Sequence, residues 1–201
     1  MVTELNSSND PLFSWEQTDK MKSKIIYLRA IEPDDYLVSY HWRNDFDIIR
    51  AYSMPRYVSK ETERKWALKA IEEHEKGISI RLSICTVNEN KLIGYINLLN
   101  INHQNKSCET SILIGDREYH GQGIASEARE IIFNYGFLTL GLVRIWSRIL
   151  HSNKAAIKNV EKFGYVKEGT LRKAIFKNGE FHDVYIYSML REEFLAKYFE
   201  S

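Results

Sequence analysis

A β-prone run passes into a helix-forming run through two glycines, Gly121 and Gly123, in the stretch IGDREYHGQGIASEAREIIF (residues 114–133). The first backbone N–H groups of a helix have no partner within it, and the helix dipole makes that end positive. Because glycine lacks a Cβ atom that would hold a phosphate away from the main chain, this strand–turn–helix junction predicts an anion site. The small Ala125 and the hydroxyl of Ser126 suit the same role. The loop is neither a P-loop nor a dinucleotide-binding turn, and the alternative is a tight turn that binds nothing.

The order of the other segments predicts one domain built on a central sheet. A helix is expected after Pro33 and is interrupted by HWRNDFD (residues 41–47), Ser59 can cap the next helix, and Gly164 ends the last one. Strands at the predicted positions and the crossover helices give an α/β (α+β) fold, with a mixed, mostly antiparallel sheet of about seven strands flanked by helices. The β-prone runs are residues 24–30, 78–87, 91–101, 108–115, 143–150, 165–176 and 180–190.

Composition excludes several classes of function. The 28 basic and 27 acidic residues leave a net charge of +1, which argues against nucleic acid as a partner. Two cysteines, Cys85 and Cys108, without metal-ligand spacing argue against a metal site and against a disulfide scaffold. The chain shows no signal peptide or membrane-spanning run, so a cytoplasmic protein without a membrane partner is expected. Residues 1–22 are expected to form a partly disordered arm, and residues 23–201 the domain.

Four segments, in order along residues 24–195, carry a resemblance to one family. EYHGQGIASEA resembles the acetyl-CoA pyrophosphate loop of the GNAT N-acetyltransferase superfamily, usually Arg/Gln-x-x-Gly-x-Gly/Ala, with His120, Gly123 and Ala125 at its defining positions. The other three resemble the branch that contains ribosomal-protein N-terminal acetyltransferases and spermidine acetyltransferases. These segments are YLRAIEPDDYLVSYHWRND (27–45), ILHSNKAAIKNVEKFGY (149–165) and EGTLRKAIFKNGEFHDVYIYSML (168–190).

The resemblance implies acetyl-CoA as cofactor and a set of residues that hold it. In such enzymes the strand before the loop separates from its neighbour and binds the pantetheine arm, the loop binds the pyrophosphate, and Asn153 meets the thioester end. A backbone N–H near residues 112–114 would stabilise the oxyanion. The alternative for Asn153 is a helix cap. The expected cofactor contacts are Ile112, Leu113, Ile114, His120, Gly121, Gln122, Gly123, Ile124, Ala125, Ser126, Asn153 and Ala156.

Catalysis by direct transfer needs a base for the attacking ammonium and a proton for the leaving thiolate. Glu109, acting through water, is the expected base and Asn153 the second catalytic residue. The alternative for Glu109 is a salt-bridged strand carboxylate. Many members of the family place a proton-donating Tyr where this chain has Val160, so the acid is unassigned. Secondary candidates for proton transfer are Tyr119, His120, Tyr165, His182 and Asp183.

The expected acceptor is a primary amine of a small molecule or of a protein N-terminus. Asn97 and Asn100 stand where polyamine-acetylating relatives have acidic residues, which argues against spermidine. A nucleotide-linked amino sugar is an alternative acceptor, since amino-sugar acetyltransferases carry a similar WRN segment. A catalytically silent acyl-CoA-binding module and a nucleotide-binding protein are rival functions, and a homodimer is plausible. The expected substrate contacts are Trp42, Asn44, Tyr52 and Asn97.

Overall fold

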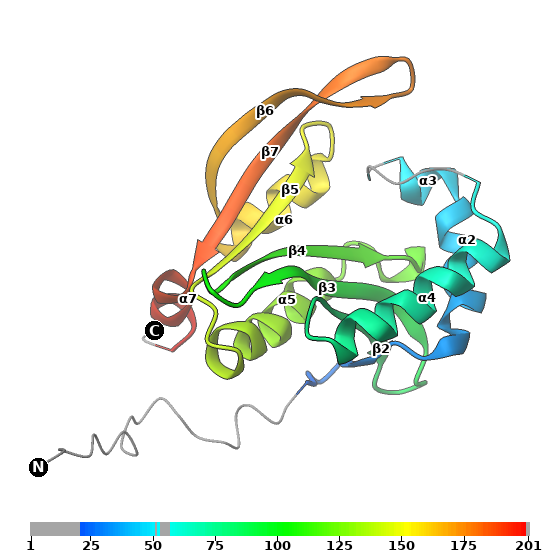
Figure 1. Ribbon diagram of the computed structural model, residues 1–201, viewed down its shortest axis with the longest axis horizontal. Helices are drawn as coiled ribbons and strands as arrows, with labels where there is room; N and C mark the ends of the chain where they lie inside the picture. Colours follow the sequence, from blue (N-terminus) through cyan, green and yellow to red (C-terminus); the bar gives the residue numbers. More distant parts are fainter. Residues whose placement is uncertain (1–20, 51, 53–56, 200–201) are drawn as a thin grey trace, which may run out of the picture.

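The computed structural model describes residues 21–50, 52 and 57–199 (Figure 1). The expected N-terminal arm therefore lies outside the described residues, apart from its last two. Of these, Met21 accepts a backbone hydrogen bond from Leu28 at 2.7 Å, and Lys22 forms an isolated bridge with Tyr27.

One sheet forms the centre of the protein, with the strand order β1-β2-β3-β4-β5-β7-β6. All neighbouring strands are antiparallel except β4 and β5, which are parallel, so the expected mixed, mostly antiparallel sheet is confirmed. A parallel pair requires a crossover connection, which helix α5 supplies. The strands are β1 (Ile26–Ala30), β2 (Ile80–Thr86), β3 (Leu92–Asn102), β4 (Ser107–Ile114), β5 (Arg144–Leu150), β6 (Val166–Lys177) and β7 (Glu180–Leu190).

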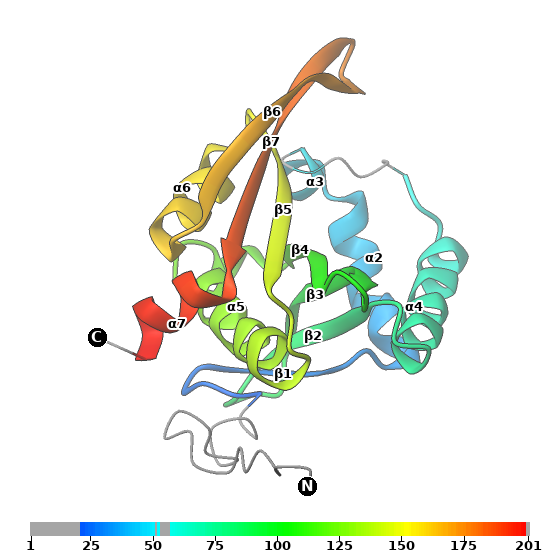
Figure 2. The same cartoon turned by 60° about the vertical axis from the view of Figure 1, so that its left-hand side comes forward.

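Helices cover both faces of this sheet, and a hydrophobic core lies under each layer. Helices α2 and α4 pack on one face, and α5 lies on the other (Figure 2). The larger core joins Phe133 of α5 and Phe194 of α7 to the strands, whereas the smaller one contains Trp42 and Tyr95. The helices are η1 (Pro33–Asp35), α2 (Tyr36–Asn44), α3 (Phe46–Ile49), α4 (Lys60–Glu75), η2 (Arg117–Tyr119), α5 (Ile124–Asn134), the π-helical η3 (Tyr135–Thr139), α6 (Lys154–Phe163) and α7 (Arg191–Phe199).

Local signals set most helix ends. The Ser59 side chain caps α4 by accepting from the Thr62 N–H, and Gly164, with φ of 106°, ends α6 as expected. The expected interruption over residues 41–47 was too wide. Helix α2 continues through Asn44, and the break is confined to Asp45, whose extended backbone and side-chain bond to the Asp47 N–H start α3. A capping Asp is enough to separate the two helices.

Candidate active site

Strands β4 and β5 are neighbours for only part of their length. They pair at three positions, ending with Glu109 opposite Trp146, and then diverge (Figure 1). On its other side, β4 stays paired with β3 as far as Ile114. Beyond Glu109, β4 therefore has an edge that faces β5 across a groove and is not covered by another strand.

The alternation of the strand decides which backbone groups face this groove. The Gly115 N–H donates to Ile93 of β3 at 2.8 Å, so Leu113 and Ser111 also direct their backbone groups toward β3. Ile112 and Ile114 direct theirs toward the groove. The ring of His120 already donates to the Ile114 carbonyl at 2.9 Å. The backbone of Ile112 is thus the part of the β4 edge open to a ligand.

The glycine junction lies at the end of this groove and forms an open cradle. Gly121 and Gly123 have φ values of +77° and +84°, and a Cβ atom added to either would meet nothing within 4 Å. Gly123 is the N-cap of α5 and offers no side chain to the helix. The N–H groups of residues 121–125 donate to no group in the part of the chain that the structure describes. Consecutive free donors at a helix N-terminus fit a pyrophosphate.

A cavity of about 590 Å³ occupies the space between the diverging strands. Segments far apart in the sequence meet there, including β4, β5, the start of α6, and both strands of the β6–β7 hairpin. Five of the expected site residues line it, together with two arginines that the sequence analysis did not select. These seven are Tyr52, Glu109, Ile112, Asn153 and Ala156, with Arg129 and Arg148.

Glu109 sits in the cavity wall as half of an ion pair. Its side chain is buried, and its two oxygens accept from Nε and Nη2 of Arg148 at 2.9 and 3.1 Å. This is the salt-bridged arrangement that the sequence left open as an alternative. Because the Arg148 side chain is 56 % exposed, the pair lies at the boundary between cavity and solvent. The carboxylate and its bound cation both line the cavity.

Asn153 caps the helix that borders the cavity. Its side-chain oxygen accepts from the Ala156 N–H at 3.0 Å, which is the alternative role expected for it. It also lines a second cavity of about 510 Å³, which the first adjoins at Leu150 and Asn153. Val160, in place of the family's Tyr, is fully buried in the larger core and contributes no proton donor.

Several expected contacts lie outside the larger cavity. Trp42 is buried against Tyr95, with ring centroids 5.7 Å apart, and Leu113 belongs to the same core. Asn44 exchanges hydrogen bonds with the backbone of Val58. Asn97 reaches the cavity only through its 2.9 Å bond to Ser111, a lining residue.

Tyr52 is the expected substrate residue that the structure does place in the cavity wall. Burial raises its pKa to about 12, against the opposing effects of Arg129 and of a hydrogen bond from the Ile114 backbone. The phenol is therefore neutral near pH 7. It lies close to the groove-facing backbone of β4.

The secondary proton-transfer candidates do not line the larger cavity in the described chain. His182 contacts His151 at 3.4 Å and the Lys177 carbonyl at 3.0 Å, beside the second cavity. Asp183 accepts from the Lys173 N–H at 2.8 Å, and the pKa of the buried Tyr165 is raised to about 12 by its burial. The Tyr119 ring lies beneath the Lys91 ammonium, 5.4 Å from its centroid.

Arg129 is one of the two cavity arginines that were not expected from the sequence. It is 5 % exposed and lies on the buried face of α5, near Ile132 and Phe133. Its Nη1 donates to the Asn159 side chain and, at 3.5 Å, to the Ala125 carbonyl. The available signal was an arginine spaced four residues from Ala125 and from Phe133, within a stripe that is otherwise apolar.

Neither a metal site nor a membrane-spanning helix is found among the described residues. They contain no group of three or more His, Cys, Asp or Glu side chains placed to hold a metal ion. None of their helices is both long and apolar enough to cross a membrane.

Comparisons with known proteins agree with this geometry. The model of the acetyltransferase (GNAT) domain matches residues 26–166. The SPbeta prophage-derived uncharacterized N-acetyltransferase YokL of Bacillus subtilis is 29% identical over 170 residues, which are 83% of this chain and 90% of that protein. The crystal structure of spermidine N-acetyltransferase from Vibrio cholerae in complex with CoA and spermine has a TM-score of 0.77 at 26% identity, covering 85% of this chain and 98% of that one.

A third match supports the fold alone. RimL, a ribosomal L7/L12 alpha-N-protein acetyltransferase in complex with coenzyme A, has a TM-score of 0.77 at 22% identity and covers 84% of this chain and 95% of that one. The family uses acetyl-CoA, so the expected cofactor is confirmed at the level of the family. The matched domain, with its diverging β4 and β5 and its open glycine cradle, leads to one assignment: the chain is an N-acetyltransferase and belongs to the GNAT acetyltransferase family.

Proposed function

We propose that this enzyme transfers an acetyl group from acetyl-CoA directly to the primary amine of a small molecule or of a protein N-terminus. The observation that carries the proposal is the separation of β4 from β5 after Glu109, which opens a groove from the glycine cradle to a buried carboxylate. An elongated cofactor with a phosphate at one end and a thioester at the other suits such a groove. The wall of the groove contains both backbone and carboxylate groups for the chemistry.

Each part of the groove has a separate task in this proposal. The free N–H groups of residues 121–125 would hold the pyrophosphate, with Ser126 beside them. The open backbone of Ile112 would hold the pantetheine arm, and the N-terminal turn of α6, with Asn153 and Ala156, would border the thioester end. Bound acetyl-CoA supplies an activated acyl carbon. The protein supplies the alignment of that carbon with the amine.

Two charge movements fall to the residues around the cavity. Glu109 would take a proton from the acceptor ammonium through a water molecule, while Arg148 holds its carboxylate in place. The groove-facing N–H of Ile112 in β4 would donate to the oxygen that becomes negative during attack. This donor is already oriented by the pairing of β4 with β3, so it needs little reorganisation.

The charges of the cavities bear on the acceptor. Glu109 is the one acidic side chain among the described residues that line the two cavities, and it is paired with Arg148. The lining cations are Arg50, Arg129, Arg148, Lys154 and Lys177. A polycation such as spermidine, the substrate named for the Vibrio cholerae enzyme, would be repelled here. This positive lining favours, as a second candidate, an amine that carries negative charge elsewhere, such as a nucleotide-linked amino sugar.

The first test of the proposal is isothermal titration of the purified protein with acetyl-CoA. We expect micromolar binding that Gly123→Glu abolishes, because a carboxylate in the cradle opposes the pyrophosphate by charge and bulk. Gly141→Glu is the matched control, since Gly141 also has positive φ and open space around it but lies away from the groove. A folded wild-type protein that binds no acetyl-CoA would refute the proposal. Thiol release with a panel of amines then identifies the acceptor.

A further inference from the structure

We propose that Arg129 is a catalytic residue that stabilises the CoA thiolate as it leaves. It would replace the proton donor that is missing at Val160. The proposal rests on the function proposed above and names the residue that acts on the leaving thiolate, which that function left unassigned. Two independent observations carry it. One is a buried arginine without an acidic partner, and the other is the absence of a proton donor at the family's usual position.

The first observation is the environment of the Arg129 guanidinium. Its Nε is buried without a hydrogen-bond partner in the described residues, and the groups that the rest of the guanidinium contacts are neutral: the Asn159 side chain, the Ala125 carbonyl and the Tyr165 phenol. No carboxylate among the described residues pairs with it, and the titratable groups that act on it, Tyr52 and Tyr165, are neutral phenols near pH 7. Burial lowers the pKa of Arg129, but a guanidinium remains protonated.

A buried cation without a counter-ion lowers the stability of the folded protein unless a ligand completes it. The N-terminus of α6, where Asn153 and Ala156 line the cavity, adds further positive potential there. The Arg129 guanidinium therefore favours an anion in a cavity that is also lined by Asn153 and Ala156, the expected thioester contacts. In acetyl transfer, the anion that forms at that end is the thiolate.

The second observation places Arg129 beside the missing acid. Its Nη1 donates to Asn159, which directly precedes Val160 on α6. Asn159 in turn donates to Ser126 at 2.9 Å, so the side chain that orients the guanidinium is itself fixed to the start of α5. Arg129, on α5, is thus joined to the turn of α6 that contains Val160, where the resemblance implies a Tyr in other members of the family.

The proposed step balances as follows. The amine nitrogen forms a bond to the acyl carbon, the C–S bond breaks, and its electron pair stays on sulfur. The acceptor ammonium loses one proton to Glu109 through water before it attacks, and its nitrogen loses a second proton to water as the amide forms; the thiolate takes up a proton from solvent after release. Arg129 stabilises the negative sulfur without transferring a proton, and the neutral thioester before reaction has no such charge. The contact is therefore stronger in the transition state than in the ground state, which is the condition for catalysis.

Binding of CoA and of acetyl-CoA at different pH tests this role without turnover. A cation beside the sulfur lowers the thiol pKa of bound CoA below the thiol pKa of free CoA. Affinity for CoA must then rise with pH between the bound and the free pKa and level off above it. We expect wild-type CoA affinity, relative to acetyl-CoA, to rise roughly tenfold or more between about pH 6.5 and 9. Arg129→Met should abolish that rise, and Arg129→Lys should retain part of it.

Controls separate this role from others. Arg64→Met, at an exposed arginine on α4, should behave as wild type. Arg129→Met should melt no lower than wild type, because an apolar side chain replaces an unpaired buried charge. Equal loss of CoA and acetyl-CoA affinity at every pH would assign Arg129 to the phosphates and overturn the proposal, as would unchanged CoA behaviour in Arg129→Met. Failure of wild type to bind acetyl-CoA would instead overturn the proposed function.

Discussion

At the scale of single residues, Glu109 shows how one side chain serves both structure and chemistry. Its carboxylate is held by Arg148, whose largely exposed side chain leaves the pair accessible from the cavity. A carboxylate in this position can accept a proton through water while its orientation stays fixed. The ion pair therefore does not compete with the proposed role of Glu109 as the base.

We expect Glu109→Gln to lower kcat roughly 10²- to 10⁴-fold, the usual effect of removing a general base. Acetyl-CoA affinity by titration calorimetry should stay within about twofold, because the amide keeps the shape of the cavity wall. Turnover should recover partly at high pH, where more of the acceptor amine is already deprotonated. A variant with normal kcat would show that Glu109 serves only as the partner of Arg148.

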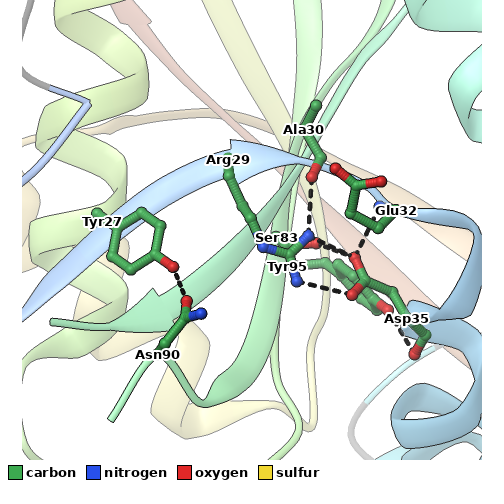
Figure 3. Close-up of polar contacts among 8 residues, drawn as sticks. All are labelled: Tyr27, Arg29, Ala30, Glu32, Asp35, Ser83, Asn90 and Tyr95. Atoms are coloured by element: carbon green, nitrogen blue, oxygen red, sulfur yellow. Dashed lines mark hydrogen bonds and ion pairs between the residues drawn. The ribbon is translucent and has the colours of Figure 1, made fainter. Parts of the chain in front are cut away.

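At the scale of secondary-structure elements, Asp35 ties η1 to the first three strands (Figure 3). Arg29 of β1 binds both of its oxygens, at 2.8 and 2.7 Å, and Ser83 of β2 donates to one of them at 2.7 Å. The Tyr95 hydroxyl of β3 donates to its backbone carbonyl at 3.3 Å. This network anchors the start of α2.

Stability should depend on the ionisation of Asp35. Its burial alone would raise the pKa of the carboxyl, but hydrogen bonds from Arg29, Ser83 and the Glu32 backbone lower it below the ordinary value. A depressed pKa contributes stability above the unfolded pKa, about 3.9, and that contribution is lost as pH falls through the folded value. Asp35→Asn should therefore lose roughly 1–3 kcal/mol of unfolding free energy at pH 7 and show a flatter acid limb.

Denaturant unfolding between about pH 7 and 2.5 measures this difference. Asp34→Asn is the matched control, because the neighbouring Asp34 is exposed and belongs to the same turn. If Asp35→Asn and Asp34→Asn gave parallel curves of stability against pH, the Asp35 network would not be a source of acid sensitivity.

At the scale of the whole molecule, the β6–β7 hairpin is joined to the segment after α3. The Lys177 ammonium donates to the carbonyls of Ile49 and Arg50, at 3.0 and 2.9 Å, and also to that of Tyr52. Lys177 and Arg50 line the second cavity and Tyr52 lines the larger one, so this junction joins residues more than a hundred positions apart in the walls of both. The acceptor side of the proposed site would depend on this junction.

We expect Lys177→Met to raise KM for the amine acceptor roughly three- to thirtyfold, the range for one or two lost hydrogen bonds, and to leave acetyl-CoA affinity unchanged. Amide exchange at Tyr52, whose N–H donates to Ile49 at 3.0 Å, should become faster. Arg172→Met, at an exposed residue of the same strand, provides the control. Unchanged KM and exchange in Lys177→Met would show that the junction is dispensable.

Features that depend on neighbours a few residues apart could be predicted from the sequence. The Ser59 cap, the end of α6 at Gly164 and the open glycines before α5 follow from backbone geometry and local hydrogen bonds. The alternation of strands and helices was enough for the fold class, and the motif order was enough for the family. Even there, the extent of the break before α3 was overestimated, because the Asp45 cap acts on a single residue.

Only the tertiary structure decided which side chains reach the cavity. Trp42 was an expected substrate contact but lies in a core, while Arg129 was unselected and lines the cavity. The same is true of the Glu109–Arg148 pair, which joins strands that meet for three positions and then diverge. The sequence by itself determined the elements, because their positions follow from caps, turns and hydrophobic periodicity over a few residues. The cavity arises from pairing and packing between distant segments, which one sequence pattern does not encode.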